Sequence, residues 1–214
     1  MKKYLILSII GICILSSCKR TEKVPETTPV IDTVSISDDT IKTDNEFLKA
    51  VNMMITKMNA ITMTNDFDFD YPKMMVEHHQ GAIDMALIEL EKGTDEKLKA
   101  LAQSIIVVQT EEQAKLKEIL RDAKPKKHKI KEIHPEMQNA MSAMMKDMKA
   151  IQLTGKTDRD FVMMMVPHQE AGIEMSKSLF FHSKNPQLKK IGQKAIRDQT
   201  KNLKEFKNWL WIKR

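Results

Sequence analysis

Asp70-Tyr-Pro-Lys-Met-Met-Val-Glu-His-His-Gln-Gly-Ala-Ile-Asp-Met85 decides the fold, because it recurs at an offset of 90 as Asp160-Phe-Val-Met-Met-Met-Val-Pro-His-Gln-Glu-Ala-Gly-Ile-Glu-Met175. Seven of these sixteen positions are identical, and they are Asp70/Asp160, Met74/Met164, Met75/Met165, Val76/Val166, His78/His168, Ile83/Ile173 and Met85/Met175. Outside the segment the same register holds without an insertion at Met54/Met144, Met58/Met148, Leu98/Leu188, Ile106/Ile196, Gln109/Gln199, Thr110/Thr200 and Leu120/Leu210. A register shared over about 75 residues indicates a duplicated architecture.

Each repeat is predicted to form three helices, because apolar residues recur at steps of three and four and no strand-like alternation is present. Thr94-Asp-Glu96 and Asn185-Pro186 suit helix starts. The expected helices cover about 44–63, 68–91 and 94–122 in one repeat, and about 135–153, 157–181 and 185–212 in the other. The sequence therefore predicts an all-α helical domain over 44–214, with repeats 45–122 and 135–212 related by a pseudo-two-fold axis.

The N-terminal residues have the pattern of a targeting signal. Lys2 and Lys3 precede the apolar run Tyr4–Leu15, which is too short to span a bilayer core of about 30 Å. The run ends in Leu15-Ser-Ser-Cys18, which resembles the lipobox of bacterial lipoproteins. We expect residues 1–17 to be a signal peptide and Cys18 to carry the lipid that anchors the protein in the bacterial cell envelope, on a periplasmic or outer-membrane face. An ordinary secretory signal with a chance cysteine is the alternative.

Composition narrows the classes of function. Residues 18–43 are rich in Thr, Ser, Asp, Glu and Pro, which predicts a flexible tether ahead of the domain. Only 2 cysteines are present, so a disulfide scaffold and a cysteine-rich zinc module are excluded. Without residues 1–17, 33 basic residues face 29 acidic ones, and this charge of +4 on an exported protein predicts no nucleic-acid partner. The unusual count is 17 methionines.

Thioethers gather around a histidine on the second helix of each repeat. At about 100° per residue, Met74, Met75 and Met85 fall within about 60° of His78. The same set recurs in the second repeat as Met164, Met165, His168 and Met175. Gly81 is expected to leave open space beside the His78 imidazole. The neighbouring His79 points toward an apolar stripe on the same helix, about 100° away, and Gln169 takes its place in the copy.

Imidazole and thioether ligands together suit a soft or borderline metal ion. Thioether is a good ligand for Cu(I) and a poor one for Mg²⁺, Ca²⁺ or Zn²⁺, whereas imidazole serves both oxidation states of copper. Apart from Met1, all sixteen methionines lie on the first two helices of each repeat. The alternative is that these methionines are adaptable core residues, since a methionine stripe at helical spacing usually marks packing.

The segment from Met74 to Met85, followed by Gln109 and Glu112, closely resembles the bacterial proteins catalogued as domain of unknown function 305. The resemblance spans both repeats, about 45–212, and implies a ferritin-like four-helix bundle made by the second and third helices, with one extra helix per repeat. It also implies copper binding at the envelope, for metal tolerance or homeostasis. By position, the implied metal-binding residues are Met74, Met75, His78, His79, Met85, Met164, Met165, His168 and Met175. The chain departs from the family pattern at Gln169, where a second histidine is usual, and at Asn202, where Glu would match Glu112.

Three functions remain open from the sequence. The first is a copper-binding lipoprotein that sequesters or relays Cu(I), or Cu(II), with a possible protein partner for transfer and no catalysis. The second is a di-iron enzyme, but no residue three positions before any histidine is Glu, so the Glu-x-x-His motif is absent. The third is a metal-free lipoprotein whose methionine-rich grooves bind a partner helix or an apolar ligand.

Overall fold

The computed structural model describes residues 45–126 and 135–213, and these form six α-helices without a strand. The helices are α1 (Glu46–Asn59), α2 (Phe67–Lys92), α3 (Glu96–Asp122), α4 (Pro135–Ala150), α5 (Thr157–His182) and α6 (Pro186–Ile212). The bounds of α5 and α6 repeat those of α2 and α3 at the offset of 90 residues that the sequence shows. The predicted all-α fold with an internal duplication is therefore confirmed.

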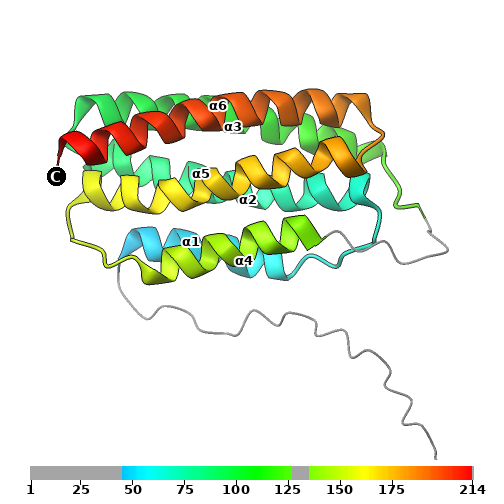
Figure 1. The fold of residues 1–214 in the computed structure, drawn as a ribbon, viewed down its shortest axis with the longest axis horizontal. Coiled ribbons are helices and arrows are strands. Elements are labelled where there is room, and N and C mark those ends of the chain that lie inside the picture. Colours follow the sequence, from blue (N-terminus) through cyan, green and yellow to red (C-terminus); the bar gives the residue numbers. More distant parts are fainter. Residues whose placement is uncertain (1–44, 127–134, 214) are drawn as a thin grey trace, which may run out of the picture. The chain divides into compact units, whose positions relative to one another are not determined.

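The helices lie in three rows of two, with α2 and α5 as the middle row (Figure 1). Helix α2 packs against α1, α3 and α5, while α5 packs against α4, α6 and α2. The second and third helices of the repeats thus lie together as predicted, and α1 and α4 cover the opposite side of the central pair. Contact between α3 and α6 is sparse, and a groove lies between them.

The helix starts follow from capping residues. The side chains of Asn45, Asp66, Asp95 and Asn185 accept hydrogen bonds from backbone amides of the following turn. Helix α2 begins at Phe67, earlier than the sequence predicted, because Asp66 is its cap and Pro72 lies inside the helix. The α1 and α4 helices end at 59 and 150, before the expected 63 and 153.

Those early ends have one cause, which is a loop closed by an aspartate of the next helix. Asp70 accepts hydrogen bonds from the Thr64 amide and hydroxyl and from the Asn65 amide, at 2.8–2.9 Å. Asp160 accepts the same three bonds from Thr154 and Gly155 at 2.7–2.9 Å. The loop requires a positive φ, which is 63° at Asn65 and 76° at Gly155, in the left-handed region that suits these residue types. The identical Asp70/Asp160 pair is therefore structural.

The described helices include none that is long and apolar enough to cross a membrane. The predicted signal peptide 1–17, the lipidation site Cys18 and the tether 18–43 lie outside the described residues, as does the linker 127–134. Those predictions remain predictions.

Replacing Asp70 with alanine leaves the Thr64 and Asn65 donors without their acceptor. We expect the free energy of unfolding to fall by about 2 kcal/mol, because hydrogen bonds to a buried carboxylate are stronger than neutral ones. Urea denaturation measures it. Asp147→Ala, an exposed position on α4, is the control and should change stability by less than about 0.5 kcal/mol. Equal stability of the two variants would contradict the assignment.

Candidate metal centre

Two histidines meet at the centre of the molecule, where α2 and α5 pack together. The rings of His78 and His168 stack with their centroids 3.9 Å apart and their planes at 21°. Neither side chain is exposed to solvent. Because the two residues are copies of each other, the pseudo-two-fold axis passes between the rings. The duplication thus brings the predicted histidines of both repeats into one place.

Neither ring has its polar atoms paired. The Nδ1 and Nε2 atoms of His78 and His168 are buried and make no hydrogen bond. Burial, then the nearby rings of His168 and His79, lowers the pKa of His78 well below its ordinary value. Burial, then His79, lowers the pKa of His168 to about 3. Both imidazoles are therefore neutral at neutral pH and keep a lone pair that a metal ion could accept.

The amide of Gln199 extends this polar cluster, and two other core amides are unpaired as well. The side-chain N and O atoms of Gln109, Gln169 and Gln199 are buried without a hydrogen-bond partner. Gly172 lets the cluster close up, because a Cβ there would lie 2.0 Å from Oε1 of Gln199 and 2.9 Å from Cε1 of His78. Nearly all buried polar groups in proteins are paired, so a group of unpaired ones at one place indicates a bound ion or ordered water.

His79 faces another direction, toward α3. Its ring lies 6.2 Å from that of His78, and its Nε2 is 3.2 Å from Oε2 of Glu112, an ion-pair distance without hydrogen-bond geometry. The other oxygen of Glu112 accepts a hydrogen bond from Lys194 of α6 at 3.0 Å. The sequence placed His79 on an apolar stripe and missed this carboxylate, since the contact depends on how α2 and α3 pack.

The methionines that the sequence predicted as ligands lie in the hydrophobic core. The fully buried ones belong to the main hydrophobic cluster and are Met75, Met85, Met164, Met165 and Met175. Met74 is partly buried against that cluster. Met75 and Met165 lie one turn from their own histidine. Met85 and Met175 lie two turns away, about 10 Å along the axis, so they flank the histidine pair.

The open space expected beside Gly81 is not there. A Cβ at Gly81 would lie 2.3 Å from Sδ of Met54, so the thioether of α1 fills the notch that the glycine provides. The expectation was wrong because the helical-wheel argument considered one helix alone. Met54 and its copy Met144 are both buried in the same hydrophobic core.

This arrangement suits a soft ion better than a hard one. In residues 45–126 and 135–213, no three His, Cys, Asp or Glu side chains converge on a point that could hold a metal. Thioethers would have to complete any coordination sphere built on His78 and His168. Lone pairs of imidazole lie in the ring plane, so two stacked rings do not aim at one point. A shared ion requires at least one ring to turn out of the stack.

The chain matches the family described as Domain of unknown function (DUF305) over residues 40–120 and over 68–210, and it belongs to that family. Among solved structures it is similar to CopM in the Cu(I)-bound form, with 27% identity and a TM-score of 0.53 over 68% of this chain and 96% of CopM. The chain is also similar to CopM in the Cu(II)-bound form, with 27% identity and a TM-score of 0.54 over 69% of this chain and 97% of CopM. A DUF305 fragment from Deinococcus radiodurans, 18% identical with a TM-score of 0.52 over 68% of this chain and 96% of the fragment, shares the fold. No curated protein matches the chain.

Glu89 shares the helix face of His78 but lies about 16 Å further along α2, outside the histidine cluster. It is fully buried near Asp158 of α5. Burial, and then the Asp158 carboxylate, raises the pKa of Glu89 to about 8. Burial opposes ionisation of Asp158 too, but hydrogen bonds from Thr94 and the Asp95 amide hold its pKa below the ordinary value. At neutral pH Glu89 is therefore protonated, whereas Asp158 is ionised.

The stability of the protein should depend on the proton of Glu89. The folded state keeps this proton up to about pH 8, whereas the unfolded chain loses it near 4.5. The contribution of protonated Glu89 to the free energy of unfolding is thus fully present below pH 4.5 and is lost as the pH rises through about 8. We expect the Glu89→Gln variant to gain stability relative to the wild type across this window, as measured by denaturation at pH 5 and pH 8.5. Parallel profiles would contradict the assignment.

Proposed function

We propose that this protein binds copper in the cell envelope, holding Cu(I) between α2 and α5 for sequestration or transfer. The observation that carries the proposal is the pair of facing, fully buried imidazoles, His78 and His168, whose nitrogens have no partner in a methionine-rich core. On this account copper turns at least one ring out of the stack and recruits thioethers from the adjacent turns. No catalysis is proposed.

Similarity to CopM supports the same metal. Three structures of CopM, described as Cu(I)-bound, Ag-bound and Cu(II)-bound forms, are each 27% identical to this chain. Silver and Cu(I) are both soft cations that thioethers bind well. The ligand chemistry of the buried core and the metals of the similar protein thus point to the same class of ion.

We further propose that the protein is anchored in the cell envelope through a lipid on Cys18, and that a second protein exchanges copper with it. The anchor rests on the lipobox-like Leu15-Ser-Ser-Cys18. In an oxidising compartment methionine is a practical soft ligand, because cysteine there tends to be oxidised. A chain whose other cysteine, Cys13, lies in the predicted signal peptide, and whose methionines are abundant, fits that compartment.

The first test is a Cu(I) titration under reducing conditions against a chromogenic competitor. The wild type should bind at least one equivalent. The double variant His78→Ala with His168→Ala should weaken binding roughly a hundredfold, the equivalent of about 2.8 kcal/mol. Met75→Leu with Met165→Leu should weaken it as well, and this change conserves volume closely enough to keep the fold.

His182→Ala and Met53→Leu are the matched controls, because His182 lies at the end of α5 and Met53 is 53% exposed on α1. Both should bind copper as the wild type does. Circular dichroism checks that each variant remains helical. Unchanged titration of the His78/His168 double variant would overturn the proposed site and favour metal-free packing of the core.

A further inference from the structure

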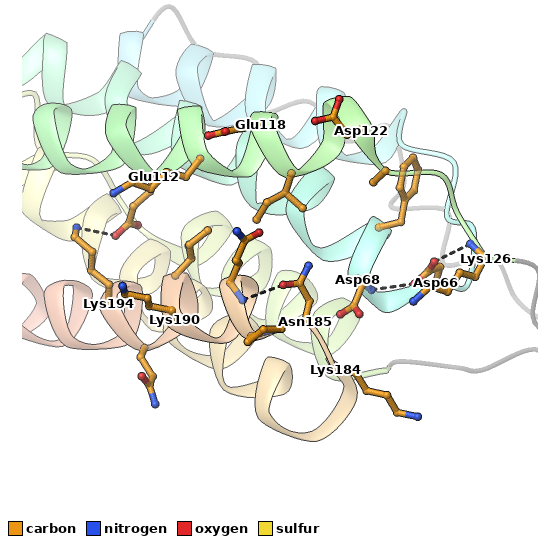
Figure 2. A pocket seen from close by; sticks show the side chains of 18 of the residues that line it. Asp66, Asp68, Glu112, Glu118, Asp122, Lys126, Lys184, Asn185, Lys190 and Lys194 are labelled. Atoms are coloured by element: carbon orange, nitrogen blue, oxygen red, sulfur yellow. Dashed lines mark hydrogen bonds and ion pairs between the residues drawn. The ribbon is translucent and has the colours of Figure 1, made fainter.

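A groove of about 1330 Å³ runs between α3 and α6 on one side of the bundle (Figure 2). Charged side chains of both signs line it, and these include Glu112, Lys115, Glu118, Lys190, Lys194 and Arg197. In Figure 2, Glu112 of α3 and Lys194 of α6 point toward each other across the groove. The groove therefore brings solvent to a pair of opposite charges.

Glu112 connects this groove with the histidines. It lines the groove, yet only 2% of its side chain is exposed. One oxygen lies 3.2 Å from Nε2 of His79, and the other accepts the hydrogen bond from Lys194. One carboxylate thus lies between the solvent-facing ammonium and the His79–His78 side of the cluster.

The Glu112–His79 pair has the spacing of two ligands on one metal ion. With bonds of about 2.1 Å, ligands at an angle of about 100° lie about 3.2 Å apart. Carboxylate oxygen and imidazole nitrogen suit Cu(II) better than Cu(I). The pair therefore offers an oxygen–nitrogen site outside the nitrogen–sulfur environment of the inner histidines.

Lys194 covers that site. Its ammonium contacts Glu112 at 3.0 Å and Asp198 at 2.9 Å, while 31% of its side chain is exposed. A cation that approaches Glu112 from the groove meets this ammonium first and is repelled by it. Asp198 provides a second carboxylate on the same helix that can retain Lys194 when it leaves Glu112.

The positions related to His79, Glu112 and Lys194 by the pseudo-two-fold axis do not repeat this arrangement. At the offset of 90 residues, His79 corresponds to Gln169, Glu112 to Asn202, and Lys194 to the exposed Ser104. All three residues of this contacting row therefore differ from their counterparts. The inner histidines are duplicated, whereas the row of contacts His79–Glu112–Lys194 has no copy at the related positions.

We propose that Glu112 and His79 form an outer Cu(II)-accepting site through which copper enters and leaves the bundle, and that Lys194 is the latch over it. This proposal rests on the copper-binding function proposed above and adds the path and its control. Cu(II) displaces the ammonium from Glu112, is held by the carboxylate and His79, and then moves inward as Cu(II), without a change of oxidation state, to the histidine pair, because imidazole serves both oxidation states of copper.

The test is the rate of copper capture, measured by stopped flow with Cu(II) supplied by a chromogenic chelator. Lys194→Ala should speed both capture and release about fivefold or more, with the end point nearly unchanged. Glu112→Gln should slow capture about tenfold, because charge attraction of this kind changes association rates by that order. The two substitutions in one ion pair should thus change the capture rate in opposite directions. A general loosening of the structure would change the capture rates of both variants in the same direction.

Lys190→Ala and Glu118→Gln are the matched controls, since both residues line the same groove and no hydrogen bond or ion pair joins them to Glu112 in the described structure. Their rates should stay within twofold of the wild type. Rates of Lys194→Ala and Glu112→Gln that match the wild type, or that change in the same direction, would overturn the entry site while leaving the inner site standing. A wild-type protein that takes up neither Cu(I) nor Cu(II) would overturn the proposed function, and the entry site with it.

Discussion

The contact on which the arrangement depends is the stack of His78 on His168. Its position on the pseudo-two-fold axis means that each repeat supplies one half of it. Two neutral imidazoles without hydrogen bonds are a costly choice for a core, because each carries polar nitrogens away from water. Apolar residues would stabilise this crossing of α2 and α5 better. The proposed copper site would account for the presence of histidine at this position in both repeats.

The two layers around this stack have different chemistry. Buried thioethers occupy α1, α2, α4 and α5, while α3 and α6 contribute amides, a carboxylate and an ammonium. Thioethers of α1, α2, α4 and α5 suit a soft metal ion, whereas the carboxylate and amide oxygens of α3 and α6 suit a harder one. The repeats share the thioether side and differ on the other, since Glu112 has Asn202 as its copy. Duplication accounts for the shared histidine pair, and the differences His79/Gln169 and Glu112/Asn202 make the two sides chemically unequal.

Most of the fold followed from periodicity and register. The six helices, the caps at Asp95 and Asn185, and the duplicated arrangement were all predicted, because each depends on residues close in sequence. The ends of α1 and α4 were placed too late, since Asp70 and Asp160 close those loops from the next helix. Within the site, the shared face of His78 and its methionines could be read from one helix. The stacking with His168 could not, because it depends on the level at which two helices cross.

Neighbouring helices also explain what the sequence missed. The notch at Gly81 was expected to be open, and only packing of α1 shows that Met54 fills it. Family resemblance placed His79 among the metal-binding residues. Its neighbour, the Glu112 carboxylate, is known only from the packing of α3 against α2. The identical pair Gln109/Gln199 was visible in the register, but only the structure shows that both amides are buried without a partner and that Gln199 lies beside His78.

The most direct measurement is a crystal structure of the copper-loaded protein with anomalous data collected at the copper edge. The account predicts a peak between α2 and α5 at bonding distance from a nitrogen of His78 or His168, with at least one ring turned out of the stack and a methionine sulfur in the coordination sphere. Copper bound only at the surface, over two rings still stacked as they are here, would contradict it.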